Sequence, residues 1–193
     1  LIIQPNIDPY TEKFNKLTVE QQLAKMFEQA KNSMSEEVDF IVFPETAISE
    51  FVKESNLKDN FKLNMISEFT ENHPDVNVII GAMTYKQFMS SDVVPESAVK
   101  VEGSDFYYDY YNSAIMFDTT GNIQIYHKSQ LLLGAEKMPL QRIFRILKKI
   151  NFDIAGGTTW YGTQDEATVF EIENNSIQFA PIICWESVFG EYN

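Results

Sequence analysis

The sequence predicts an α/β fold in which helices cover a mixed β-sheet. Strand-type and helix-type patterns alternate early in the chain, and hairpin patterns dominate from Tyr110 onward. The 193 residues are 44% apolar and 13% aromatic, which is enough for one domain with a sizeable core. No internal repeat is visible. We therefore expect a single domain over residues 1–193.

The first elements carry clear local signals. Leu1–Gln4 has the composition of a strand and is followed by turn residues at Pro5–Asn6. Thr18 predicts a helix N-terminus because Gln21 stands in capping-box position. Asp39–Phe43 predicts a short buried strand that Pro44 ends. The apolar face of the predicted helix comprises Val19, Leu23, Met26, Phe27 and Ala30.

A second helix and a second buried strand are predicted next. Phe61, Met65 and Phe69 recur at helical spacing, and the run over residues 76–83 is apolar and short. The polar stretch over residues 87–104 predicts a surface loop.

The remaining elements are mostly hairpins. YNSAIMFD and IQIYHK flank a turn at TTGN, which predicts an antiparallel pair. Apolar positions between 140 and 150 predict a helix after Pro139. Ala167–Glu173 and Ile177–Cys184 predict two further strands joined at Asn174–Asn175, and residues 156–164 predict another surface loop.

Composition excludes several classes of function. The net charge is −13, and phosphate-backbone binding requires a positive surface, so we expect no nucleic-acid partner. No apolar run approaches the ~20 residues of a membrane-spanning helix. His73 and His127 match no metal-ligand pattern, and Gly156–Gly157 lacks the spacing of a nucleotide-binding loop, so we expect no metal and no cofactor.

Three predicted strand ends each deliver one reactive side chain. Glu45 follows the first buried strand, Lys128 follows IQIYH, and Cys184, the single cysteine, follows APII. The carboxyl ends of strands are where catalysts gather in layered α/β proteins. Each residue also has an ordinary interpretation, because a lone cysteine is most often a small core residue and charged side chains are usually solvated.

The three residues lie within three segments that together carry a resemblance. IVFPETA, YHKSQLLLGAEKMP and IICWES resemble, in order, the signature segments of the carbon–nitrogen hydrolase (nitrilase) superfamily. The resemblance implies an αββα four-layer sandwich with a catalytic triad of Glu45, Lys128 and Cys184. Because the chain opens at Leu1 inside a strand and stops soon after Cys184, we expect a piece of a longer protein, with the sandwich incomplete at its C-terminal end.

Within that superfamily, the chain resembles the apolipoprotein N-acyltransferase family. The segments QPNIDPYTEKF and YNSAIMFDTTGNIQIYHKSQLLLGAEKMPL are similar to that family, as is the aromatic residue and glutamate after Cys184, although Trp185 stands where a tyrosine is usual. The resemblance implies transfer of a fatty acyl chain from a phospholipid, through a cysteine thioester, to the N-terminal amine of an apolipoprotein. It also implies a domain on the periplasmic side of the bacterial inner membrane, anchored by segments outside these residues.

The chemistry assigns expected roles. A free thiol is mostly protonated at neutral pH, so Cys184 needs a base, for which Glu45 is the candidate. Lys128 would favour the thiolate and, with the backbone N–H of Trp185, stabilise the oxyanion. By resemblance, Glu136 would be a further glutamate that holds Lys128. Glu186 would either position the substrate amine or fix the loop beside the thiol, and the alternative for both glutamates is that they only neutralise charge. Tyr10, Phe14 and Trp160 are aromatic candidates for the lining of a water-excluding site, although core packing is the commoner role of any one aromatic residue.

Two alternatives remain open on the sequence. A soluble amidase or nitrilase-type hydrolase would use the same three residues on a small C–N substrate and release ammonia. A catalytically silent binding or scaffold domain would keep the fold without the reaction. The sequence Trp-Glu-Ser after the cysteine argues against the first alternative, and the presence of all three reactive residues argues against the second.

Overall fold

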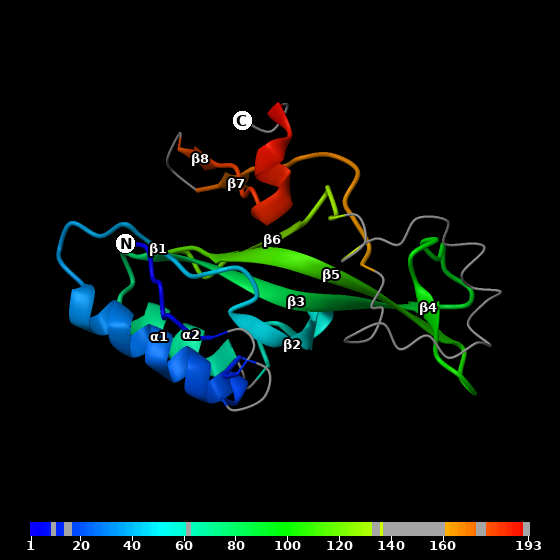
Figure 1. Ribbon diagram of the computed structural model, residues 1–193, viewed down its shortest axis with the longest axis horizontal. Coiled ribbons are helices and arrows are strands. Elements are labelled where there is room, and N and C mark those ends of the chain that lie inside the picture. Colours follow the sequence, from blue (N-terminus) through cyan, green and yellow to red (C-terminus); the bar gives the residue numbers. More distant parts are fainter. Residues whose placement is uncertain are drawn as a thin grey trace.

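The structure is a computed structural model that describes residues 1–8, 11–13, 17–60, 63–132, 136, 161–172 and 177–190. Its described part has three layers (Figure 1): two helices, a six-stranded mixed sheet, and a two-stranded sheet followed by a 3₁₀-helix. This arrangement confirms the α/β prediction and agrees with an αββα sandwich that is incomplete. No helix within the described residues is long and apolar enough to cross a membrane.

Helix α1 (Val19–Ser33) forms as the sequence predicts. The Thr18 side chain accepts from the Gln21 backbone N–H, and the Gln21 side chain accepts from the Thr18 N–H, which completes the capping box. Its apolar face lies against the sheet and is buried. The buried residues include Val19, Leu23, Met26, Phe27 and Ala30, as predicted.

Helix α2 (Asn64–Asn72) matches the second predicted helix, with Ile66 and Phe69 buried. Met65 is partly buried, and Phe61 lies outside the described residues. Both helices pack on the same face of the sheet, where Phe27 contacts Phe69 with ring centroids 5.1 Å apart.

Strand β3 (Asn77–Met89) runs through the middle of the sheet, and two parallel strands share one of its edges. β1 (Phe40–Val42) pairs with its first residues, and β2 (Ile48–Lys53) pairs further along. The Leu1–Gln4 strand is reduced to a bridge between Ile2 and Val42. The predicted surface loop from residue 87 was wrong at its start, because β3 continues to Met89 by pairing with its other neighbour.

That neighbour is β5 (Phe106–Phe117), which is antiparallel to β3 along its whole length. The opposite edge of β5 carries β4 (Val99–Lys100) and β6 (Ile123–His127), so the predicted hairpin is confirmed. The Asp118 side chain closes the turn by accepting from the Thr120 and Asn122 N–H groups, and Gly121 has φ +80°.

The two faces of the main sheet differ. The helix-covered face holds the larger apolar core, and the other face holds a smaller cluster beneath the second sheet. The smaller cluster comprises Ala114, Met116, Tyr126, Phe170 and Ile183. Because side chains alternate along a strand, consecutive residues of β5 and β6 point to opposite layers.

The second sheet is shorter than the sequence predicts. β7 (Phe170–Glu171) and β8 (Gln178–Phe179) pair antiparallel, but residues 180–183 form no strand. The apolar segment APII at 180–183 has the composition of a strand, and its last residue Ile183 packs in the cluster on the main sheet, but the segment pairs with no strand among the described residues. The 3₁₀-helix η3 (Cys184–Val188) follows directly. The helix predicted between 140 and 150 lies outside the described residues.

Candidate active site

Glu45 lies on the turn between β1 and β2. The connection bulges out there, because Val42 pairs with Ile79 and Ile48 pairs with Ala82 on the same edge of β3, so that residues 43–47 lie opposite residues 80–81 alone. Gly81 of β3 permits the bulge: a Cβ at that position would lie 2.6 Å from the Pro44 carbonyl oxygen and 2.7 Å from the Glu45 Cα. Thr46 has φ +51°, an uncommon conformation for a residue with a side chain. The local fold therefore presents the Glu45 side chain on a fixed, strained turn.

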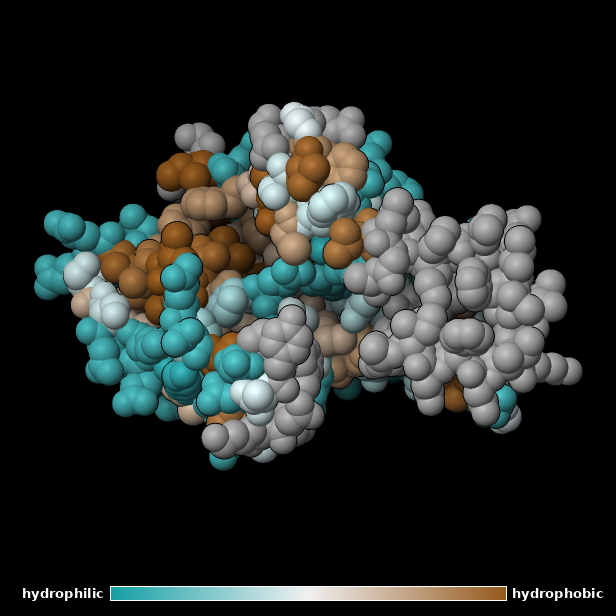
Figure 2. Space-filling model, viewed as in Figure 1, coloured by the Kyte–Doolittle hydropathy of each residue, from teal (hydrophilic) through white to brown (hydrophobic). Residues whose placement is uncertain are grey.

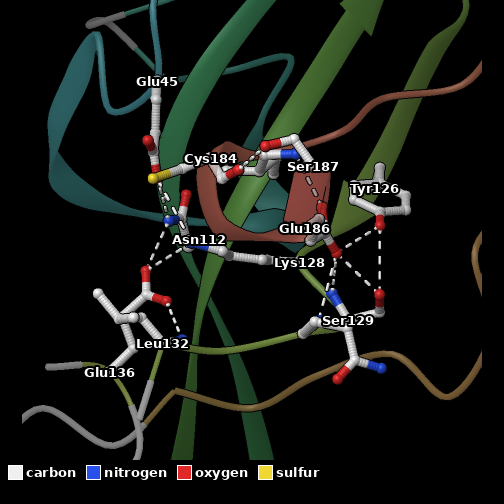
Figure 3. Close-up of polar contacts among 12 residues, drawn as sticks. Glu45, Asn112, Tyr126, Lys128, Ser129, Leu132, Glu136, Cys184, Glu186 and Ser187 are labelled. Carbon is white, nitrogen blue, oxygen red and sulfur yellow. Dashed lines mark hydrogen bonds and ion pairs between the residues drawn. The ribbon is translucent and has the colours of Figure 1, made fainter. Parts of the chain in front are cut away.

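Lys128 follows β6 and is 1% exposed. Its Nζ donates to Glu136 Oε1 at 2.9 Å and lies 3.7 Å from Glu45 Oε1 (Figure 3). Glu136 Oε2 accepts from the Leu132 backbone N–H at 2.8 Å, which fixes the second carboxylate. Burying an ammonium group is costly unless it is paired, and the two glutamates are the partners that offset this cost for Lys128.

Asn112 of β5 joins the same group. Its Nδ2 donates to Glu45 Oε1 at 2.8 Å and to Glu136 Oε1 at 3.2 Å, and its backbone carbonyl accepts from the Lys128 N–H at 2.8 Å. Glu45 Oε2 forms no hydrogen bond or ion pair within the described part of the chain. One oxygen of Glu45 is thus held in place, and the other has no partner among the residues that the structure describes.

Glu186 is 0% exposed and accepts hydrogen bonds on both carboxylate oxygens, although it lies in the short η3. Its Oε1 accepts from Tyr126 OH (2.7 Å), from the Ser129 N–H (2.7 Å) and hydroxyl (2.8 Å), and from the Gln130 N–H (3.3 Å). Its Oε2 accepts from the Ile183 N–H at 2.8 Å. This carboxylate joins the chain after Lys128 to the chain at Cys184, so the geometry favours the loop-fixing role over contact with a substrate amine.

Cys184 is the first residue of η3 and has φ +48°, a strained conformation for a non-glycine residue. The sequence predicted it at the end of a buried strand, whereas the structure exposes it. Figure 3 shows the side chains of Cys184 and Glu45 pointing toward the same space. A cavity of about 290 Å³ opens there. Its lining is Val42, Phe43, Glu45, Ile79, Gly81, Ser113, Ala114, Phe170, Phe179, Ala180, Pro181, Ile182, Ile183 and Cys184.

The cavity is therefore mostly apolar except where two reactive groups reach it. Figure 2 shows apolar surface gathering around a hollow between the N-terminal end and the part formed by β7, β8 and η3. Apolar side chains on that part are exposed, among them Ile182 and Val188. Such a site suits a substrate with a large apolar group.

The structure brings Glu45, Lys128 and Glu136 together and places Glu45 and Cys184 on one cavity. The Trp185 side chain is 37% exposed and meets Phe189 edge to face. The expected lining residues Tyr10, Phe14 and Trp160 all lie outside the described residues. Among the residues that the structure describes, no group of three or more His, Cys, Asp or Glu side chains could hold a metal ion.

Two further groups near the site are ones that the sequence did not indicate. Lys13 Nζ donates to the Glu45 carbonyl at 3.4 Å; burial lowers the pKa of Lys13, and the Glu45 charge opposes that shift. The pKa of Tyr161 is raised by burial and then by the charges of Glu136 and Glu45. For Asn112 the sequence does contain a signal. Once the hairpin turn at 119–122 is recognised, pairing the residues of β5 and β6 outward from the turn places Asn112 opposite Lys128.

A second ionic cluster lies on the helix-covered face. Glu54, in the 3₁₀-helix η1 (Glu54–Asn56), accepts from His127 Nε2 at 2.7 Å and from the Thr84 hydroxyl at 2.8 Å, and Lys86 Nζ lies 3.5 Å away. Burial alone would raise the pKa of Glu54, but these hydrogen bonds and charges outweigh it and lower the pKa. His127 thus points away from Lys128, as strand alternation predicts.

Several known proteins resemble this chain. The apolipoprotein N-acyltransferase of Chlorobaculum tepidum is 28% identical over 97% of this chain, which spans 35% of that relative's length. An N-terminal amidase solved with a Gln-Gly peptide is 17% identical, with a TM-score of 0.39 over 68% of this chain and 27% of its own. The protein XC1258 from Xanthomonas campestris, a CN-hydrolase superfamily member, is 12% identical, with a TM-score of 0.42 over 86% of this chain and 48% of its own.

The family match covers nearly the whole chain. The carbon-nitrogen hydrolase family matches residues 2–192, a span that includes Glu45, Lys128 and Cys184. This match agrees with the α/β layers and with the order of the three segments along the chain. The chain belongs to the carbon-nitrogen hydrolase family.

Proposed function

We propose that this domain is an N-acyltransferase that moves a fatty acyl chain from a phospholipid to the N-terminal amine of an apolipoprotein. The observation that carries the proposal is the apolar cavity that Cys184 and Glu45 share, with the buried ammonium of Lys128 3.7 Å from the same carboxylate. The resemblance to a relative named apolipoprotein N-acyltransferase supports the choice of acyl group and acceptor.

In the first half of the reaction, the Cys184 sulfur attacks the ester carbonyl of the phospholipid, and Glu45 takes the thiol proton through Oε2, the oxygen that no other described residue contacts. The tetrahedral oxyanion is stabilised by the Lys128 ammonium group and by the backbone N–H of Trp185. The C–O bond then breaks, Glu45 returns the proton to the leaving oxygen, and a lysophospholipid departs. Cys184 is left as a thioester.

In the second half, the neutral α-amine of the acceptor attacks the thioester carbonyl. Glu45 accepts the amine proton, the C–S bond breaks, and the sulfur recovers a proton from Glu45 as the amide forms. We propose that the apolar lining of the cavity limits hydrolysis of the thioester in the interval. Lipid substrates place the reaction at a membrane, and we propose the periplasmic side of the bacterial inner membrane.

The test uses the protein at its natural full length and a phospholipid with an isotope-labelled acyl chain. Intact-mass measurement should find one acyl adduct that maps to the peptide containing Cys184, and Cys184→Ala should abolish it. Adding a lipopeptide with a free N-terminal amine should move the label to that amine. Release of ammonia from small amides without any phospholipid-derived adduct would instead establish the amidase alternative.

A further inference from the structure

Asn112 shows an unusual pattern of contacts beside the three proposed catalytic residues. Its side chain is buried, at 6% exposure, and its Nδ2 donates to two different carboxylates. We infer that Asn112 is a positioning residue that divides the work of these carboxylates, so that Glu136 holds Lys128 while Glu45 stays available as the base. This inference rests on the triad of the proposed function and not on the identity of the acyl donor.

Distances show how the division arises. Lys128 Nζ lies 2.9 Å from Glu136 Oε1 but 3.7 Å from Glu45 Oε1. Asn112 Nδ2 has the reverse preference, at 2.8 Å from Glu45 and 3.2 Å from Glu136. Glu45 is therefore held mainly by a neutral amide, whereas the full positive charge pairs with Glu136. A carboxylate bonded to a neutral donor remains a better base than one bonded directly to an ammonium group.

Charge explains why a neutral donor is needed. Two carboxylates that approach one ammonium group leave an excess negative charge, and like charges in a buried site repel each other. The Asn112 amide has two N–H groups and contacts both Oε1 atoms without adding charge. An aspartate in its place would add a third negative charge and remove both donors.

The other half of the amide argues against a purely structural role. Asn112 Oδ1 is buried and has no hydrogen-bond partner among the described residues. A buried acceptor without a donor costs free energy, and a purely structural position would favour a side chain that avoids that cost. The amide keeps this orientation because its NH₂ group is required on the side of the carboxylates. Its value at this position is therefore the pair of N–H donors.

The test follows acylation of Cys184 as a function of pH. An activated acyl ester such as a p-nitrophenyl ester is used beside the labelled phospholipid, with the protein at full length. Asn112→Asp should slow acylation at pH 7 by about 10²-fold, and the acidic limb of the pH–rate profile should move up by about one pH unit or more, because Glu45 gains a negative neighbour. The other groups facing Glu45 are Lys128, Glu136, Lys13, Tyr161 and Cys184, and they are unchanged in this variant.

A second substitution separates positioning from folding. In the double variant Asn112→Asp with Glu136→Gln, the glutamine amide can donate to the introduced carboxylate, and one negative charge is gone. It should be acylated about tenfold faster than Asn112→Asp alone, with the limb moved back. Asn77→Asp is the matched control, because Asn77 is a buried strand asparagine whose amide bonds to Asp39 and Thr119. It should affect unfolding and leave the limb in place.

Contrary outcomes are equally defined. The inference would be overturned if the acidic limb of the pH–rate profile stayed in place in Asn112→Asp. It would also be overturned if Glu136→Gln slowed acylation as much in the Asn112→Asp variant as it does in the wild type. If Asn112→Asp does not fold, Asn112→Ala must move the limb in the same direction, because Glu45 loses its nearest donor. Acylation of the wild type by the activated ester but not by phospholipid would sink only the proposed donor, and acylation by neither would sink both proposals.

Discussion

Two consecutive residues, His127 and Lys128, point to opposite faces of one sheet, and each contacts a carboxylate there. On the helix-covered face, Glu54 uses both oxygens, with His127 and Thr84 on one and Lys86 near the other. On the cavity face, Glu45 uses one oxygen and leaves the other without a partner among the described residues. Both carboxylates form ion pairs, so an ion pair alone does not mark a catalytic carboxylate. The feature that distinguishes the candidate catalytic carboxylate from the structural one is an oxygen without a partner beside a cavity.

The largest effect should separate these two carboxylates. Glu45→Gln should slow formation of the acyl adduct on Cys184 by about 10²–10⁴-fold, because the amide cannot take the thiol proton. Glu54→Gln should leave that rate nearly unchanged and lower the free energy of unfolding by about 1–3 kcal/mol, because buried donors lose their charged acceptor. Adduct mass and denaturant unfolding, measured on both variants, check the contrast. Similar rates in the two variants would remove it.

Gly81 sharpens the comparison by moving Glu45 without changing its chemistry. In Gly81→Ala, a methyl group would meet the Pro44–Glu45 backbone, so the turn must shift. We expect adduct formation to fall by about 10²-fold, the scale of a misplacement of about 1 Å. Gly190→Ala is the control, because a Cβ there meets no atom within 4 Å. Equal activity of Gly81→Ala and Gly190→Ala would show that the turn does not position Glu45.

Glu186→Gln tests the link between Lys128 and Cys184. In this variant, the NH₂ group of the glutamine replaces one carboxylate oxygen and faces a backbone N–H group, of Ser129 or of Ile183, that donates to that oxygen in the wild type. We expect the loss of this acceptor to lower the free energy of unfolding by about 1–3 kcal/mol. Adduct formation should fall by about tenfold, because a looser connection spoils the alignment of the two sides. Thermal unfolding and adduct rate are measured together. A stability loss without any change in rate would make Glu186 a purely structural residue.

How far the sequence predicts the molecule depends on whether a signal is local. The capping box at Thr18 and the turn at 119–122 are local, and both elements form where predicted. The extent of β3 and the shortness of β7 depend on neighbouring strands, which single-sequence patterns do not report. The Glu45, Lys128 and Cys184 assignment came from motif resemblance. Distances were needed to propose a role for Asn112 and to choose between the roles expected for Glu186. The sequence did not predict that Cys184 is exposed, because the residues before it are apolar and have the composition of a buried strand.

The smallest effect concerns pH and the structural carboxylate. Because the pKa of Glu54 is lowered in the folded chain, its ionised form contributes stability above its ordinary value of 4.5, and that contribution is lost as the pH falls through the folded value. The difference in unfolding free energy between the wild type and Glu54→Gln should therefore shrink below about pH 4.5. Denaturant midpoints across a range of about pH 3–7 measure it. A difference that grows on acidification would contradict the Glu54 assignment.

One paired measurement tests the central claim, that the cavity face carries the chemistry. The rate of acyl-adduct formation on Cys184 is compared between Lys128→Met and His127→Phe, substitutions at consecutive positions on opposite faces. We predict that Lys128→Met loses at least about 10²-fold, because the oxyanion donor and the partner of two carboxylates are gone, while His127→Phe keeps the wild-type rate. Equal rates in the two variants, or a greater loss in His127→Phe, would contradict the account.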